Sequence, residues 1–173
     1  MKRHGPWDDE PNESAWTTEA GLPAMLRRGP SGAWCGYVRV ESSHRLHAKT
    51  YSDEIPSPIG LLSQPVGARG ILPIFCKAGT NQSETTTLDI LFDVHGSVTF
   101  AGASDGLRGV KGDGGWWIGF DCNHSGDAAP DATWSSEGVY RTFDYAHAQC
   151  ESLAKQIVRY DDEMAMRDAG GTP

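Results

Sequence analysis

Two apolar stretches separated by turn residues stand near the start of the chain. Residues 22–27 and 33–40 are rich in apolar side chains, and residues 29–32 between them read Gly-Pro-Ser-Gly. Glycine and proline in a short linker between two such runs are typical of a β-hairpin. The pattern therefore predicts two antiparallel strands joined by a tight turn.

A second group of apolar stretches follows in the middle of the chain. Residues 88–94 and 97–100 predict strand segments that meet at a His-Gly pair, and residues 116–121 predict a buried strand. A polar, glycine-rich loop joins them. Four prolines argue against a long helix in the segment 41–87, which stays unassigned apart from one predicted edge strand at 71–76.

The spacing changes near the C-terminus, where apolar residues recur every three or four positions. This is the period of one buried helix face, and the residues that form it are Phe143, Ala146, Cys150, Leu153 and Ile157. The Thr142 hydroxyl can cap the first turn, and the acidic run 161–163 is expected to end the helix. Several strands followed by one long helix indicate an α+β fold, with a mainly antiparallel sheet and the helix packed on one face.

The length of 173 residues corresponds to a single domain. We expect a flexible N-terminal arm over residues 1–20, because this stretch is polar and contains two prolines. The α+β domain is then expected to span residues 21–160, and residues 161–173 are expected to form a polar tail.

Charge and cysteine usage narrow the classes of partner. The chain carries a formal net charge of −8 and has no basic stripe, which disfavours binding to duplex nucleic acid. No stretch is long and apolar enough for a membrane span, and the N-terminus lacks the apolar run of a secretion signal. Four cysteines without a CxxC pair are consistent with reduced thiols. We therefore expect a cytoplasmic protein, either monomeric or a homo-oligomer.

Most of the candidate chemistry lies in two short segments, residues 93–96 and 121–127. His95 stands at a predicted strand end, where the backbone is held in place and the side chain is accessible. A histidine oriented by a carboxylate is a serviceable general base near neutral pH. The candidate pairs are His95 with Asp121, and His124 with Asp93 or Asp127. We therefore predict His95, His124 and Asp127 as catalytic residues, with Asp93 and Asp121 as further polar contacts to a ligand.

A metal centre is the second interpretation of the same segments. Cys122 and His124 are two residues apart and would share one face of an extended chain. Together with His95 they would form a mixed nitrogen and sulfur site, completed by Asp127 or Asp93, and zinc is the metal that such ligands favour. The competing explanation is a buried cysteine beside a histidine that makes a structural hydrogen bond.

Ligand binding without turnover is the third interpretation. The indole of Trp116 or Trp117 can stack on a nucleotide base, while Arg108 and Lys111 in the glycine-rich loop can close over its phosphates. Adjacent strand residues point in opposite directions, so at least one of the two tryptophans is expected to fill the core instead. The loop matches neither the Walker nor the dinucleotide-binding fingerprint.

Four blocks of the sequence form a recognisable combination: Gly36-Tyr-Val, Asp93-Val-His-Gly-Ser-Val-Thr-Phe, Trp116-Trp-Ile-Gly-Phe-Asp-Cys-Asn-His-Ser-Gly-Asp and Cys150-Glu-Ser-Leu-Ala-Lys-Gln. Together they resemble the pattern of a family of small proteins encoded by bacteriophages and prophages, over roughly residues 20–158. The family pattern has glycine at the position of Ser97, and commonly alanine at those of Asn123 and Ser125. These departures bear on the identity of a ligand more than on the fold.

The resemblance implies an accessory protein in the cytoplasm of an infected bacterium, where such proteins often counter host defence. The leading hypothesis is binding of a small nucleotide signal of the cyclic or ADP-ribose type. One alternative is a metal-dependent or His/Asp acid–base hydrolase of such a nucleotide, for which His95 and His124 should approach each other. The other is an inhibitor that binds a host defence protein, of the anti-CRISPR type, for which the acidic surface should matter.

Overall fold

The computed structural model describes residues 4–58, 84–104, 107, 114–131 and 138–170. Its elements in chain order are the 3-10 helix η1 (Pro6–Asp8), β1 (Glu13–Thr17), β2 (Pro23–Arg28), β3 (Trp34–Val40), β4 (Ile55–Pro56), β5 (Thr85–Thr86), α2 (Leu88–Leu91), β6 (Phe100–Ala103), β7 (Trp116–Asp121), β8 (Asp127–Ala128), β9 (Val139–Tyr140) and α3 (Phe143–Asp168).

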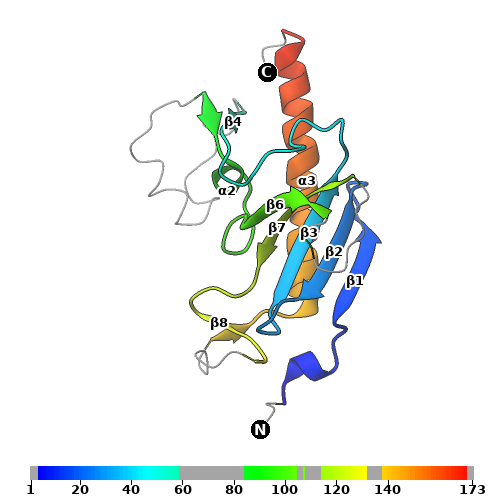
Figure 1. Cartoon of the computed structure of the whole chain (residues 1–173), viewed down its shortest axis with the longest axis vertical. Coiled ribbons are helices and arrows are strands. Elements are labelled where there is room, and N and C mark those ends of the chain that lie inside the picture. Colours follow the sequence, from blue (N-terminus) through cyan, green and yellow to red (C-terminus); the bar gives the residue numbers. More distant parts are fainter. Residues whose placement is uncertain (1–3, 59–83, 105–106, 108–113, 132–137, 171–173) are drawn as a thin grey trace.

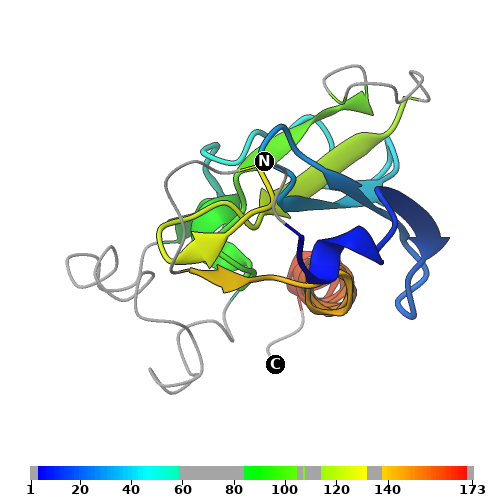
Figure 2. The same cartoon turned by 90° about the horizontal axis from the view of Figure 1, so that it is seen from below.

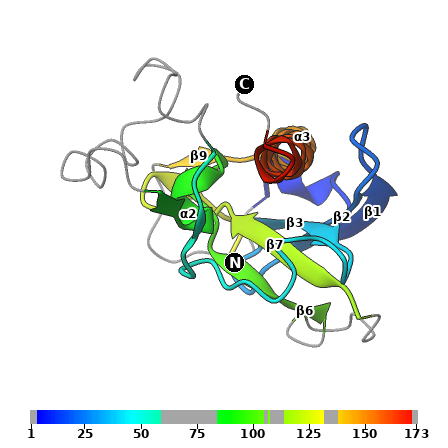
Figure 3. The same ribbon diagram turned by 90° about the horizontal axis from the view of Figure 1, so that it is seen from above.

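A five-stranded antiparallel sheet forms the centre of the fold, with the strand order β1-β2-β3-β7-β6 (Figure 1). The predicted hairpin is its β2–β3 pair, in which Met25 lies opposite Tyr37. Helix α3 lies across one face of the sheet, as the two views along the helix show (Figures 2 and 3). The α+β class, with one long C-terminal helix on one face of an antiparallel sheet, is therefore confirmed.

The main core fills the space between this sheet face and α3. Alternate residues of β3 point toward the helix, among them Trp34 and Val38, which are fully buried. The predicted apolar stripe of α3 faces them with Cys150, Leu153 and Ile157, also fully buried. Strand alternation and helical periodicity thus place their apolar sides against each other, as amphipathic elements require.

Helix α3 begins as predicted and ends later than predicted. The Thr142 hydroxyl accepts a hydrogen bond from the Tyr145 N–H at 3.2 Å and caps the first turn. The helix continues through the acidic run to Asp168, because Tyr160 and Met164 extend its buried stripe by two turns. The prediction of a polar tail from residue 161 is therefore wrong. No helix among the described residues combines the length and apolarity of a membrane span.

The predicted strand at residues 88–94 is wrong as well. Residues Leu88–Leu91 form the short helix α2, and the chain then runs as a loop to β6. Leu88, Leu91 and Phe92 are spaced three and four residues apart and are all buried, so one helical face satisfies a pattern that we interpreted as a strand. The strand expected at 97–100 lies three residues later, in β6, and the edge strand expected at 71–76 lies outside the described residues.

The N-terminal segment is tied to the rest of the molecule, contrary to the expectation of a flexible arm. Strand β1 forms one edge of the sheet. Between η1 and β1, the Glu10 carboxylate accepts hydrogen bonds from the Arg28 guanidinium at 2.7 Å, the Trp34 indole at 3.1 Å and the Phe143 backbone N–H at 2.8 Å. It also pairs with the Tyr140 hydroxyl. Glu10 thereby joins the N-terminal segment to β2, β3 and the start of α3.

Glu10 should make the stability of the protein depend on pH. Burial by itself raises the Glu10 pKa. Hydrogen bonds from Tyr140, the Phe143 N–H and Trp34, together with the positive charge of Arg28, outweigh this effect and keep the pKa below its ordinary value of 4.5. A carboxyl with a lowered pKa stabilises the folded state above its ordinary pKa, and this contribution is lost as the pH falls.

We expect Glu10→Gln to lower the free energy of unfolding at pH 7 by about 1–3 kcal/mol. The deficit should shrink as the pH falls from 4.5 through the lowered pKa of Glu10, because the wild-type side chain then also becomes protonated. Urea unfolding at pH 7 and pH 3.5 measures both effects. The matched control is Glu13→Gln, which removes a more exposed carboxylate whose ion pair with Arg27 is long, at 3.7 Å. A Glu10→Gln deficit that is equal at both pH values would contradict the prediction.

Candidate functional site

A stripe of polar residues on α3 holds the loop that carries His95. The His95 N–H donates to Gln149 Oε1 at 2.8 Å, and the Asp93 N–H donates to Gln156 Oε1 at 2.8 Å. The Gln156 side-chain amide donates back to the Asp93 carbonyl oxygen at 2.9 Å. These hydrogen bonds fix the backbone of residues 93–95 against the helix, although this stretch has no regular secondary structure.

Asp127 is the centre of the cluster. Its side chain is 3% exposed, and the residue lies at the start of β8, in the turn that follows β7. Oδ2 accepts from His95 Nε2 at 2.7 Å and from the His124 backbone N–H at 3.0 Å, while Oδ1 accepts from Arg141 Nε at 2.9 Å. This buried carboxylate is satisfied by three hydrogen-bond donors, and it draws three separate segments together.

The protonation of the His95–Asp127 pair follows from the hydrogen bonds that the Asp127 carboxylate accepts. Burial by itself raises the Asp127 pKa, but hydrogen bonds from His95, Arg141 and the His124 N–H outweigh it and hold the pKa below 3.8. Asp127 is therefore a carboxylate at neutral pH and can only accept hydrogen bonds. The proton between the two side chains is carried by His95 Nε2. His95 Nδ1, on the other side of the ring, lies 3.1 Å from the Tyr145 hydroxyl.

The His124 ring sits against the backbone of Gly96. Gly96 has a φ of +68°, and a Cβ at this position would lie only 2.1 Å from the His124 ring. His124 Nδ1 lies 3.9 Å from both Asp127 Oδ2 and Asp121 Oδ1, beyond hydrogen-bond distance. This nitrogen is buried and has no hydrogen-bond partner within the described part of the chain. The rings of His95 and His124 meet edge to face, with their centres 5.5 Å apart.

Arg141 and Tyr145 complete the partly open side of the cluster. The Arg141 side chain is 30% exposed, and its guanidinium carbon lies 5.0 Å from the centre of the Tyr145 ring. Its hydrogen bond with Asp127 raises the Arg141 pKa, so the guanidinium stays charged. Burial raises the Tyr145 pKa, so its hydroxyl is protonated at neutral pH.

The structure brings together His95, His124 and Asp127, the three residues that we predicted as catalytic. Asp121 lies at the border of this cluster, where its carboxylate accepts from the Thr99 hydroxyl at 2.8 Å and from the Asn123 N–H at 3.1 Å. Asp93 is exposed, and it contacts α3 through its backbone.

Cys122 does not join the predicted metal ligands. It is 1% exposed and packs in the main core. Burial raises the pKa of its thiol, which disfavours the thiolate that binds metals. Side chains continue to alternate between the two sides of the chain just beyond the end of β7, and this alternation directs the Cys122 side chain toward the core. Among the described residues, the side chains grouped closely enough to hold a metal ion are those of His95, His124 and Asp127.

The residues predicted to bind a nucleotide base are not at this cluster. Trp116 and Trp117 lie at the start of β7, four or more residues from Asp121 at its end, which corresponds to about 13 Å or more along a strand. Trp116 packs against the main core and donates to the Lys49 carbonyl oxygen, whereas Trp117 is buried on the opposite sheet face. Arg108 and Lys111 lie outside the described residues.

Four residues that contribute to the cluster were missed in the sequence: Arg141, Tyr145, Gln149 and Gln156. Three of them follow one another at helical spacing, four and seven residues apart, beside the apolar stripe of α3. This second, polar stripe is visible in the sequence. The sequence does not show which segment this polar stripe binds, because its partners are the backbone groups of a distant loop.

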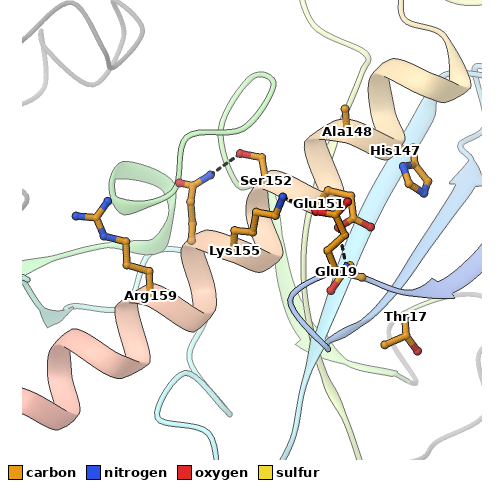
Figure 4. Close-up of a pocket in the computed structure, with 10 residues that line it drawn as sticks. Thr17, Glu19, His147, Ala148, Glu151, Ser152, Lys155 and Arg159 are labelled. Carbon is orange, nitrogen blue, oxygen red and sulfur yellow. Dashed lines mark hydrogen bonds and ion pairs between the residues drawn. The ribbon is translucent and has the colours of Figure 1, made fainter.

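A shallow groove of about 890 Å³ lies elsewhere, between α3 and the end of β1 (Figure 4). Three of its charged groups have partners there: Lys155 Nζ lies 2.7 Å from Glu19 Oε2, and the Glu151 carboxylate accepts from the Trp16 indole at 2.8 Å and from the Glu19 N–H at 2.9 Å. The groove therefore joins β1 to the helix. It is lined by Gln156, whose side chain holds the Asp93 backbone, but not by His95, His124 or Asp127.

Comparison with known proteins identifies no relative of this chain. The sequence matches no protein-family model and no curated protein, and no solved structure matches the fold.

Proposed function

We propose that the protein is a hydrolase that cleaves a phosphate ester or anhydride bond in a small nucleotide-type molecule. The observation that carries the proposal is the convergence of two imidazoles on one buried carboxylate. His95 Nε2 and His124 Nδ1 come from different loops and lie 2.7 Å and 3.9 Å from Asp127 Oδ2. This approach of the two histidines favours a hydrolase over a site that only retains its ligand.

The cluster offers the groups that hydrolysis needs. A water oxygen must bond to phosphorus while the phosphorus–oxygen bond of the leaving group breaks, and one proton must move from the water to the leaving oxygen. The imidazole–carboxylate cluster is suited to activating the water. The protonated hydroxyl of Tyr145 is suited to donating to the leaving oxygen. Arg141, partly exposed and permanently charged, is suited to contacting a phosphoryl oxygen.

The nucleotide as substrate rests on the resemblance to a family of small bacteriophage-encoded proteins, because accessory proteins of bacteriophages often counter host defence. A cyclic or ADP-ribose-type nucleotide made as a defence signal in the host cytoplasm contains the bond that this chemistry breaks. We favour turnover over simple retention because Trp116 and Trp117, one of which was expected to stack on the base, both lie away from the cluster. Destruction of such a signal would serve an infecting phage.

The test is incubation of the full chain with a panel of cyclic and ADP-ribose-type nucleotides, followed by chromatography. We expect a new product from at least one of them, formed at least about 100-fold more slowly by His124→Ala. His4→Ala is the matched control, since His4 pairs with Asp8 at 3.2 Å on the exposed surface. A nucleotide that is released intact by heat would replace the hydrolase with a binding protein. A panel that is neither bound nor converted would refute both.

A further inference from the structure

We propose that the cluster is a divalent metal site of the zinc class, with His95 Nε2, His124 Nδ1 and Asp127 Oδ2 as ligands. The role of the ion rests on the proposed hydrolase, but its binding rests on geometry alone. One donor atom from each residue lies within 4.8 Å of the other two. Two imidazoles and one carboxylate on one side of an ion are a recurrent ligand set for zinc and related metals.

The spacing of the donor atoms fits an ion of this class. Ligands of tetrahedral zinc lie roughly 3.4 Å apart, because two bonds of about 2.1 Å meet at a tetrahedral angle. The separation of His95 Nε2 and Asp127 Oδ2 is 2.7 Å, and that of His124 Nδ1 and Asp127 Oδ2 is 3.9 Å. These values lie on either side of the ideal, so shifts of under about 1 Å would centre an ion between the three atoms.

The unpartnered nitrogen of His124 is the second observation. Buried polar atoms in proteins are nearly always paired, and each exception calls for an explanation. His124 Nδ1 is buried without a hydrogen-bond partner within the described residues, and the close contact of its ring with Gly96 holds it in that orientation. A metal ion between His124 and Asp127 would satisfy this nitrogen.

The surrounding hydrogen bonds have the arrangement of an outer shell. A ligating histidine usually bonds through its second nitrogen to a neighbouring group, and a ligating carboxylate through its second oxygen. His95 Nδ1 lies 3.1 Å from the Tyr145 hydroxyl, and Asp127 Oδ1 accepts from Arg141 at 2.9 Å. The proposed ligand atoms His95 Nε2 and Asp127 Oδ2 are hydrogen-bonded to each other in the structure, and a bound ion would replace that hydrogen bond.

Charge explains why a phosphate substrate would need the ion. With neutral imidazoles, the carboxylates of Asp121 and Asp127 and the guanidinium of Arg141 sum to a net charge of −1. The whole chain carries −8. A phosphate would be repelled by this site, whereas a divalent ion would reverse the sign of the local charge. An open fourth position on the ion would take water, whose pKa the metal lowers toward 7.

A ligating nitrogen offers its lone pair to the metal, so binding at His95 Nε2 requires the proton there to move to His95 Nδ1, where the Tyr145 hydroxyl oxygen can accept it in a hydrogen bond. Titration of Zn²⁺ into the metal-free full chain, followed by calorimetry, measures stoichiometry and affinity. We expect one ion per chain. His124→Ala should weaken binding by more than the roughly 10–100-fold that loss of an outer-shell partner costs. His4→Ala should bind as the wild type does.

The result that would overturn the site is the absence of Zn²⁺ binding, or binding that His124→Ala leaves unchanged while circular dichroism shows a folded variant. Zn²⁺ bound with this stoichiometry but without conversion of any nucleotide would support the metal site and refute the hydrolase. Conversion that persists in excess chelator, with no metal retained, would refute the metal site and leave the hydrolase standing.

Discussion

Replacement of Asp127 by asparagine is expected to lower the free energy of unfolding by about 3 kcal/mol. The carboxylate is 3% exposed and accepts from the His95 imidazole, the His124 N–H and the Arg141 guanidinium. An amide oxygen can replace one carboxylate oxygen, but the amide nitrogen would face a donor. The substitution would also leave the positively charged Arg141 guanidinium without its carboxylate partner. Breaking a buried ionic network from one side is among the costliest single substitutions.

Urea unfolding of Asp127→Asn beside Asp121→Asn measures this effect. Asp121 is the matched control because it is a carboxylate of the same cluster that is 31% exposed and accepts from Thr99 and the Asn123 N–H. We expect Asp121→Asn to lower the free energy of unfolding by about 1 kcal/mol or less, since its partners can turn to water. Equal losses in the two variants would show that Asp127 does not hold the three segments together.

Alanine at Gly96 is expected to cost about 3 kcal/mol and to displace His124. Its Cβ would lie 2.1 Å from the His124 ring, so the imidazole must move away. The φ of +68° adds a cost of about 1–2 kcal/mol for any residue with a side chain. Because His124 is held in place by this contact, Gly96→Ala should also weaken Zn²⁺ binding about 10-fold or more.

Gly21→Ala separates the two causes. Gly21 has a similar φ of +85°, but a Cβ there would meet nothing within 4 Å. We expect this variant to show the backbone cost alone, about 1–2 kcal/mol, and an unchanged affinity for Zn²⁺. Chemical denaturation and calorimetry of the two variants give both quantities. If Gly96→Ala behaved like Gly21→Ala in both measurements, the contact between Gly96 and His124 would be unimportant.

Ser97 lies in a backbone conformation that favours glycine, with a φ of +90°. The serine hydroxyl donates to the Asp89 carbonyl oxygen at 2.7 Å. Serine therefore gains a local hydrogen bond in a conformation that is unfavourable for any residue with a Cβ.

The candidate site could be predicted in its residues but only partly in its geometry. His95, His124 and Asp127 stood out because histidine and aspartate gathered around glycine turns in two short segments. The pairing of His95 with Asp127 was not among the acid–base pairs that the sequence suggested. Cys122 was assigned to the site by a two-residue spacing that only holds if the strand continues beyond Asp121. The chain instead turns, and the cysteine packs in the core.

The local pattern by itself determined the hairpin, the strand at 116–121, the cap at Thr142 and the apolar face of the last helix. Each of these depends on neighbours within a few positions, where side-chain period and turn chemistry decide the conformation. Tertiary structure decided the rest. Leu88 and Leu91 are helical, with Phe92 directly after the helix, because all three side chains then reach the core. The cluster around Asp127 exists because a polar stripe of α3 holds a distant loop, and no local pattern encodes that contact.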